Sequence, residues 1–252
     1  MLRVLGNHTG FSALKRMLHL LRGAGARKTF GVLVSSLDDH YLKTFDRRYR
    51  VLTSGYVPLS STSIAPARLR DATQYRPANA WGCRRLLREL GLPRQLHFVD
   101  LGCGLGRICI LAGEYGFEKV TGVELAPELC AQARANLKRC RPPSGRISPI
   151  SILEMDALNF CERTDDDVFF MFRPFSWEFM RRILDQLIER SRRKPLTIIY
   201  SEKMMLPGSY TRQISEEPAL RKTFAGGWFG QAFFVYQCGN QVKVSKRDPV
   251  GA

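Results

Sequence analysis

The chain has 252 residues, of which 44% are hydrophobic, so it can bury a core and has the composition of a globular protein. No run approaches the roughly 18 apolar residues of a membrane span, and no such span is expected. The formal net charge is +16. Most of the excess lies in residues 1–95, which hold 17 Lys and Arg against 5 Asp and Glu, a net of +12.

This basic excess favours an anionic partner such as RNA, an acidic metabolite or a membrane surface, although a solvated basic surface explains it equally well. The seven cysteines form no C-x-x-C pair, and the four histidines are not spaced as metal ligands are. We therefore expect reduced, buried thiols in a cytoplasmic protein, and no metal. Nothing in the sequence indicates an oligomeric state.

Residues 1–37 contain no Asp or Glu, and their leucines recur at helical spacing between Lys15, Arg16 and Arg22. This pattern predicts a basic amphipathic helix. Such a helix would cap the main domain or lie on a membrane surface, and an acid-free start is also typical of organelle import signals. Import is therefore the alternative to a cytoplasmic location.

Residues 41–70 are expected to be irregular and basic, and the next helix is expected over 78–90. From residue 96 apolar strands alternate with helical patterns, which indicates a mainly parallel sheet. The last two strands have no helix between them and should pair antiparallel at one edge. Strands are predicted over 96–101, 119–124, 150–154, 168–172, 196–201, 221–224 and 232–237, and helices over 105–115, 127–139 and 177–189.

The predicted fold class is therefore α/β, a Rossmann-like arrangement whose seven-stranded sheet is mainly parallel and has an antiparallel C-terminal edge. The expected organisation has three parts. Residues 1–74 form a basic helical or irregular extension, 75–238 form the main domain, and 239–252 form a polar tail.

The most informative segment is a glycine turn between the first strand of this pattern and the helix that follows it. Gly102, Gly104 and Gly106 stand as G-x-G-x-G, directly after Asp100. Such a turn exposes backbone N–H groups that attract an anion, while the acid attracts a positive charge. A ligand with a carboxylate and a positive centre fits both features, and S-adenosylmethionine has that pattern of charges.

Acidic residues also stand at the ends of the next two strands. Glu124 ends the second strand and Asp156 follows the third. Ligands of doubly wound sheets bind at the carboxyl ends of the strands, so we expect these acids to converge with Asp100 on one cleft. Glu124 lies about 20 residues beyond the glycine turn, where an acid can accept hydrogen bonds from both ribose hydroxyls.

These motifs resemble those of the class I S-adenosylmethionine-dependent methyltransferases. The segment VDLGCGLG (99–106) is similar to their first motif, VE (123–124) to the second, and EMDA (154–157) to the acidic motif after the third strand. The resemblance covers residues 75–238. The segments FDRRY (45–49), TSG (53–55) and YRPA (75–78) also resemble a bacterial group of such enzymes whose substrates are poorly defined.

The resemblance implies a role for each matching residue. The three glycines would shape the loop under the methionine moiety, and Asp100 would orient the cofactor through that loop and its amino group. Glu124 would hold the ribose. Asp156 and Ala157 would meet the adenine, and Phe172, which opens the fourth motif, would also contact the cofactor.

The fourth motif departs from the family pattern. Amine-modifying members carry Asn or Asp before Pro-Pro and an aromatic residue, whereas this chain has FRPF (172–175). Arginine has donors only, so Arg173 cannot accept a hydrogen bond from a target amine. It would instead clamp an anionic substrate, or it would point outward or pair with one of Asp165–Asp167.

Two further residues are candidates on the substrate side. Tyr75 would shield the sulfonium from water or pack in the core. Glu202, just after the fifth strand, is a candidate general base.

The sequence thus predicts a methyltransferase that uses S-adenosylmethionine and acts on an unidentified acceptor, with RNA, a protein or an acidic metabolite as candidates. The alternative is a catalytically inert module on the same fold, which binds RNA or an anionic membrane through its basic N-terminal region. A nicotinamide oxidoreductase is disfavoured, because the glycine spacing differs and the charge of Asp100 would oppose a pyrophosphate.

Overall fold

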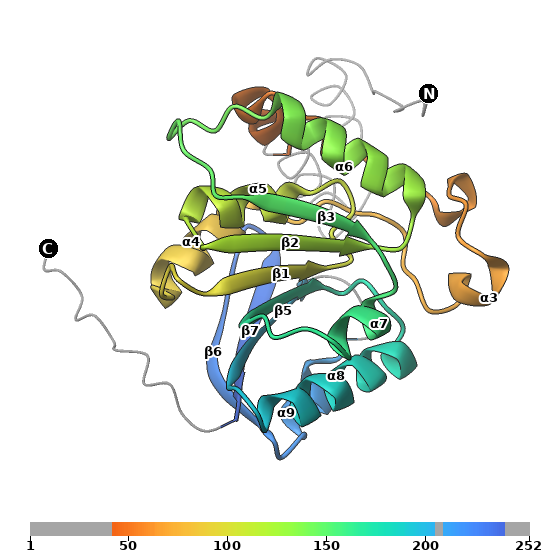
Figure 1. Cartoon of the computed structure of the whole chain (residues 1–252), viewed down its shortest axis with the longest axis vertical. Helices are drawn as coiled ribbons and strands as arrows, with labels where there is room; N and C mark the ends of the chain where they lie inside the picture. Colours follow the sequence, from red (N-terminus) through yellow and green to blue (C-terminus); the bar gives the residue numbers. More distant parts are fainter. Residues whose placement is uncertain (1–41, 205–208, 240–252) are drawn as a thin grey trace, which may run out of the picture.

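The computed structural model describes residues 42–204 and 209–239. Its centre is one sheet with the strand order β3-β2-β1-β4-β5-β7-β6 (Figure 1). The strands are β1 (His97–Leu101), β2 (Lys119–Glu124), β3 (Ile150–Glu154), β4 (Val168–Phe172), β5 (Leu196–Lys203), β6 (Leu220–Trp228) and β7 (Gln231–Cys238). The first five run parallel, and β7 is antiparallel to both β5 and β6. The predicted α/β fold is confirmed.

Helices cover both faces of the sheet. They are α4 (Ala80–Leu90), α5 (Arg107–Tyr115), α6 (Pro127–Arg139), α7 (Ala157–Cys161), α8 (Trp177–Ser191) and α9 (Thr211–Ser215). Figure 1 shows α4, α5 and α6 on one side of the sheet and α7, α8 and α9 on the other. Each central strand is therefore covered on both faces, which is why its sequence is a continuous apolar run.

Alternate residues of the central strands belong to two separate core clusters. Phe98 and Phe170 pack with α4 and α5 in one cluster. Val99, Phe169 and Met171 pack with α7 and α8 in the other. Successive side chains of a strand point to opposite faces, so the sheet itself divides the core.

The bounds of most elements in the main domain follow the sequence pattern closely, but β6, predicted over 221–224, runs over Leu220–Trp228. Strands β2, β3 and β4 and helix α6 have the bounds that the sequence predicts. Helices α7 and α9 were not predicted. Each has five residues, which is too short to show a helical period.

Residues 42–49 form a helix, where an irregular segment was expected. The reason is an apolar stripe that the surrounding arginines obscure in the sequence. Leu42, Phe45 and Tyr49 are buried at helical spacing, and Phe45 and Tyr49 join the core cluster of α4 and α5. The helix predicted within 1–37 and the tail beyond residue 239 lie outside the described residues.

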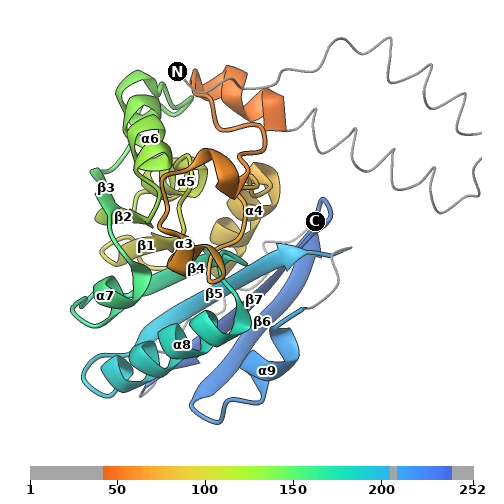
Figure 2. The same cartoon turned by 90° about the vertical axis from the view of Figure 1, so that its right-hand side faces the viewer.

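The segment that follows this helix crosses the edge of the sheet at which the parallel strands end. It contains the short helices η1 (Leu59–Ser61) and α3 (Pro66–Leu69). Figure 2 shows α3 and its flanking segment in front of that edge. Isolated bridges join Val57 to Tyr75 and Ala72 to Phe175. We call residues 51–76 the crossing segment.

A buried ion pair anchors the crossing segment beside the glycine turn. Arg107, the first residue of α5, is 2% exposed and lies 3.2 Å from the carboxylate of Asp46. The same carboxylate accepts hydrogen bonds from the amide and hydroxyl of Thr53, at 2.8 and 2.6 Å. Arg107 Nε donates to that hydroxyl at 2.8 Å. The sequence motifs FDRRY and TSG thus meet at one polar cluster next to Gly106.

All seven cysteines are buried and free. Among the described residues, no helix has the length and apolar character that a bilayer crossing requires.

Candidate functional site

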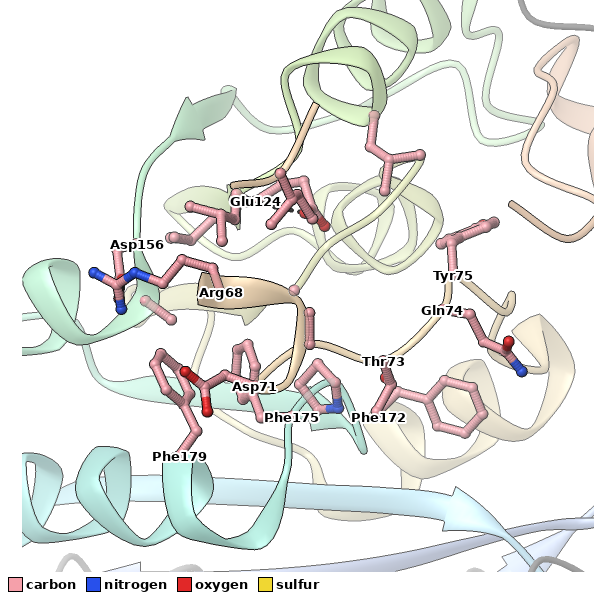
Figure 3. Close-up of a pocket in the computed structure, with 18 of the residues that line it drawn as sticks. Arg68, Asp71, Thr73, Gln74, Tyr75, Glu124, Asp156, Phe172, Phe175 and Phe179 are labelled. Atoms are coloured by element: carbon pink, nitrogen blue, oxygen red, sulfur yellow. Dashed lines mark hydrogen bonds and ion pairs between the residues drawn. The ribbon is translucent and has the colours of Figure 1, made fainter. Parts of the chain in front are cut away.

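A cavity opens at the carboxyl ends of β1, β2 and β3, under the crossing segment (Figure 3). It has a volume of about 800 Å³, counted to its open mouth. Five of the predicted cofactor residues line it: Gly102, Glu124, Asp156, Ala157 and Phe172. The strand ends therefore bring the predicted residues to one place, as the fold class requires. We call this space the acidic cavity.

The glycine turn forms the floor of the acidic cavity. Gly102 and Gly104 have φ angles of +76° and +52°, which residues with a side chain rarely adopt. A Cβ on Gly102 would lie 2.5 Å from Pro174, and one on Gly104 would lie 2.2 Å from the ring of Tyr75. The glycines therefore permit close contact with side chains of this chain. Gly106 begins α5 as its N-cap residue.

Glu124 ties the second strand to the glycine turn. Its carboxylate accepts from the backbone amides of Gly104, Leu125 and Ala126, at 2.9, 2.8 and 3.0 Å. Burial raises the pKa of Glu124, and these three amides act in the opposite direction by favouring the charged form. A carboxylate has about four lone-pair sites, so Glu124 retains acceptor capacity for a ligand.

Asp156 lines the cavity just beyond the end of β3 and has two partners within the chain. One oxygen accepts from the amide of Leu158 at 2.8 Å, which caps α7. The other pairs with Arg68 of α3 at 2.8 Å, and Figure 3 shows the guanidinium of Arg68 beside this carboxylate. Asp156 is 8% exposed and Arg68 is 43% exposed. A ligand that donates to Asp156 would therefore compete with Arg68.

Asp100 does not line the acidic cavity. It is buried behind the glycine turn, where Cys109 Sγ donates to its carboxyl at 3.8 Å. Burial raises the pKa of Asp100 to about 8, and the nearby Glu124 acts in the same direction. Burial therefore favours the neutral form of Asp100.

Tyr75 lies over the glycine turn, on the wall formed by the crossing segment. Its hydroxyl donates to the carbonyl of Thr53 at 2.8 Å. Its ring faces Gly104 and lines the acidic cavity. Tyr75 thus links the cavity to the cluster of Asp46, Thr53 and Arg107.

Arg173 and Glu202 do not line the acidic cavity. Arg173 lines a neighbouring cavity, with its guanidinium 5.2 Å from the ring centre of Tyr210. Its predicted alternative partners, Asp165–Asp167, precede β4 whereas Arg173 follows it, so that alternative is wrong. Glu202 is buried and accepts from Tyr200 at 3.0 Å and from Ser209 at 2.5 Å.

The sequence patterns did not identify several of the residues that line the acidic cavity. Arg68 and Asp71 come from the crossing segment, and Phe175 and Phe179 come from the start of α8 and the loop before it. Pro66 at the first position of α3 is the one local signal for this part of the cavity. In the part of the chain that the structure describes, no three His, Cys, Asp or Glu side chains gather as metal ligands would.

A comparison with protein families finds that residues 98–193 match a model described as a methyltransferase domain. A comparison with curated proteins finds no match.

Solved structures with a similar fold include a candidate RNA methyltransferase from Pyrococcus horikoshii. It is 19% identical, with 67% of this chain and 88% of that chain covered and a TM-score of 0.51. A candidate methylase from Haemophilus influenzae is 17% identical, over 63% and 99% of the two chains, with a TM-score of 0.46. Magnesium protoporphyrin IX methyltransferase from Synechocystis, crystallised with S-adenosylmethionine, is 15% identical, over 63% and 76%, with a TM-score of 0.48.

The sheet order and the glycine turn therefore define a class I methyltransferase fold. Within this fold, residues 98–193 are the part of the chain that matches the methyltransferase-domain model.

Proposed function

We propose that this protein is a methyltransferase that uses S-adenosylmethionine and acts on an acceptor that carries an anionic group. One observation carries the proposal. Glu124 and Asp156, from the ends of successive strands, line the same cavity as the glycine turn. When bound, S-adenosylmethionine would supply an activated methyl group, whose bond to sulfur breaks as a bond to the acceptor forms and sulfur keeps the electron pair.

The chemistry of the acidic cavity fits this cofactor. Glu124 would accept a hydrogen bond from one ribose hydroxyl with the one lone-pair site left, of about four, after its three amide contacts. Asp156 would accept from the exocyclic amine of adenine in place of Arg68. The apolar side chains of Leu125, Met155 and Phe179 supply a surface for the adenine ring.

Aromatic residues lie where the positive centre of the cofactor is expected. Phe172 and Tyr75 line the cavity, Tyr75 beside Gly104, and aromatic faces attract a cation. Tyr75 also covers Gly104, so it can exclude water from this part of the cavity. Asp100 would act through the loop that it supports.

Methyl transfer requires alignment of the acceptor with the methyl group, and such orientation can contribute about 7–11 kcal/mol. The crossing segment supplies rigid walls for this alignment, since it is bonded to the domain at both ends. Thr53 pairs with Asp46 at its start, and the Thr73 amide donates to the carbonyl of Pro174 at 3.0 Å near its end. The alternative of an inert binding module has no support in the comparisons with known proteins.

Calorimetric titration of the full-length protein with S-adenosylmethionine tests the proposal. We expect one site per chain, and we expect Glu124→Gln to weaken binding about 30-fold, because hydrogen bonds to a charged group contribute about 1.5–3 kcal/mol. Glu118→Gln is the matched control, since Glu118 is exposed just before β2, at the end of that strand remote from the cavity. No binding by the wild type, or equal binding by both variants, would contradict the proposal.

A further inference from the structure

A second cavity lies beside the acidic cavity at the same edge of the sheet. Its volume is about 820 Å³, counted to its open mouth. Four residues line both cavities: Thr73, Gln74, Arg76 and Phe172. A molecule in the second cavity would thus be separated from the cofactor only by this shared wall.

Positive charge dominates the second cavity. Among the described residues that line it, three are cations and none is an acid: Arg76, Arg173 and Lys203. We call it the basic cavity. The nearest acid in sequence, Glu202, does not line it and is buried in hydrogen bonds to Tyr200 and Ser209. Such a site favours an anion and disfavours a cationic amine.

The guanidinium of Arg173 is oriented by an aromatic residue at the basic cavity. It lies 5.2 Å from the ring centre of Tyr210. Arg173 and Tyr210 are both half-buried, and an arginine stacked on a ring is restricted in its rotation. A guanidinium of this kind suits the two oxygens of a carboxylate or phosphate.

The backbone at Arg173 is held in an unusual conformation. Its φ angle is +40°, which costs a residue with a side chain about 1–2 kcal/mol. The crossing segment holds this turn in place, because Thr73 Oγ1 donates to the carbonyl of Arg173 at 3.0 Å and the Asp71 carbonyl accepts from Ser176 N at 3.0 Å. Strain that the surroundings maintain is frequent at functional sites.

We propose that the basic cavity is the acceptor subsite, and that it binds a small acceptor through a carboxylate or phosphate group. This inference rests on the proposed function, since it names the acceptor class for that reaction. Arg173 and Lys203 would bind the anionic group, and Arg76 would add charge from the shared wall. Phe172 and Tyr210 would contact the remainder of the acceptor.

The concave shape favours a small molecule over RNA. An RNA strand is bound through charges spread along an open surface, whereas these three cations converge on one cavity between the crossing segment and the ends of β4 and β5. RNA is therefore the competing outcome of the test.

The test uses the full-length protein saturated with S-adenosylhomocysteine, titrated with three probes of similar size: benzoate, phenyl phosphate and neutral benzyl alcohol. We expect one or both anions to bind and benzyl alcohol to bind at least tenfold more weakly. Preference for benzoate or for phenyl phosphate distinguishes a carboxylate acceptor from a phosphate acceptor.

Variants test whether the anionic probes bind in the basic cavity. Arg173→Gln and Lys203→Gln should each lower the affinity for the anionic probes about tenfold. Arg173→Lys should bind these probes more tightly than Arg173→Gln does. Arg146→Gln, in the exposed loop after α6, is the matched control and should bind as the wild type does. All of these variants should bind S-adenosylhomocysteine normally, which separates this proposal from the proposed function.

Three results would overturn the proposal that the basic cavity is the acceptor subsite. One is equal binding of benzyl alcohol and the anions. Another is unchanged anion affinity in both Arg173→Gln and Lys203→Gln. The third is binding of an RNA oligonucleotide that Arg173→Gln abolishes while no small anion binds. Failure of S-adenosylhomocysteine to bind the wild type would instead contradict the proposed function.

Discussion

The acidic and basic cavities share a wall but differ in the charged residues that line them. The acids Glu124 and Asp156 stand at strand ends and are fixed by backbone amides. The cations of the basic cavity come from the crossing segment and from the residues after β4 and at the end of β5. The strand ends thus supply the acids Glu124 and Asp156 and two of the three cations, and the crossing segment lines both cavities.

This difference suggests how a common fold can serve different acceptors. The acidic cavity depends on features that any sheet of this order provides at its carboxyl edge. The basic cavity depends on how residues 71–76 pair with residues 173–176. Because the crossing segment lines both cavities, changes in it should alter both.

The largest effect is expected where the crossing segment is anchored. Asp46→Ala leaves the buried guanidinium of Arg107 without its carboxylate, and breaking a buried pair costs about 3–5 kcal/mol. Urea unfolding should show a much lower midpoint. The control is Asp185→Ala, which removes an exposed pair with Arg181 and should leave the midpoint unchanged. Equal midpoints for Asp46→Ala and the wild type would show that the segment is anchored in another way.

The glycine turn offers the next test. Gly104→Ala adds a Cβ 2.2 Å from the ring of Tyr75 at a positive φ, so we expect a loss of about 2–3 kcal/mol of stability from strain and overpacking. Gly145 also has a positive φ, but a Cβ added there meets open space. Gly145→Ala should therefore lower the free energy of unfolding by only about 1 kcal/mol. Thermal and urea unfolding measure both. If Tyr75→Ala does not reduce the cost of Gly104→Ala, the contact with the ring is not its cause.

The raised pKa of Asp100 predicts that the free energy of unfolding depends on pH. Burial raises its pKa in the folded protein to about 8 from 3.8. Between these two pH values the folded protein keeps a proton on Asp100 that the unfolded chain has released. The free energy of unfolding should therefore fall as the pH rises from about 4 to about 8, by up to about 1.4 kcal/mol per pH unit. Asp100→Asn should lack this component. Its stability relative to the wild type should therefore increase across that range in urea unfolding, and a constant difference would contradict the buried state of Asp100.

The smallest effect concerns Arg68, which pairs with Asp156 in the acidic cavity. If adenine replaces Arg68 at this carboxylate, Arg68→Ala should strengthen cofactor binding about two- to fivefold, since a partly exposed pair contributes about 0.2–1 kcal/mol. Calorimetry measures this change. Arg70→Ala, at an exposed position just after α3, should have no effect. Weaker binding by Arg68→Ala would mean that Arg68 contacts the cofactor itself.

Much of the sheet and the acidic cavity could be predicted from the sequence, because their signals are local. Apolar runs mark β2, β3 and β4; Glu124 ends β2, and Asp156 stands two residues after β3. Pro127 marks the first turn of α6, whose bounds match the prediction. Parallel strands bring their ends together, so residues far apart in sequence could be assigned to one cleft.

The basic cavity could not be predicted, because no local pattern joins its parts. Arg76, Arg173 and Lys203 are separated by 97 and 30 positions and meet only through the pairing of the crossing segment with the residues after β4. The ion pair of Arg68 with Asp156 was missed for the same reason. The helix at 42–49 was missed because its three buried residues alternate with several charged ones.

The central claim is that the two cavities bind different molecules, and one titration tests it most directly. S-adenosylmethionine is titrated into the wild type, Glu124→Gln and Arg173→Gln under the same conditions. We predict that the wild type and Arg173→Gln bind within twofold of each other, while Glu124→Gln binds about 30-fold more weakly. Equal binding by all three proteins, or an equal loss in both variants, would contradict the account.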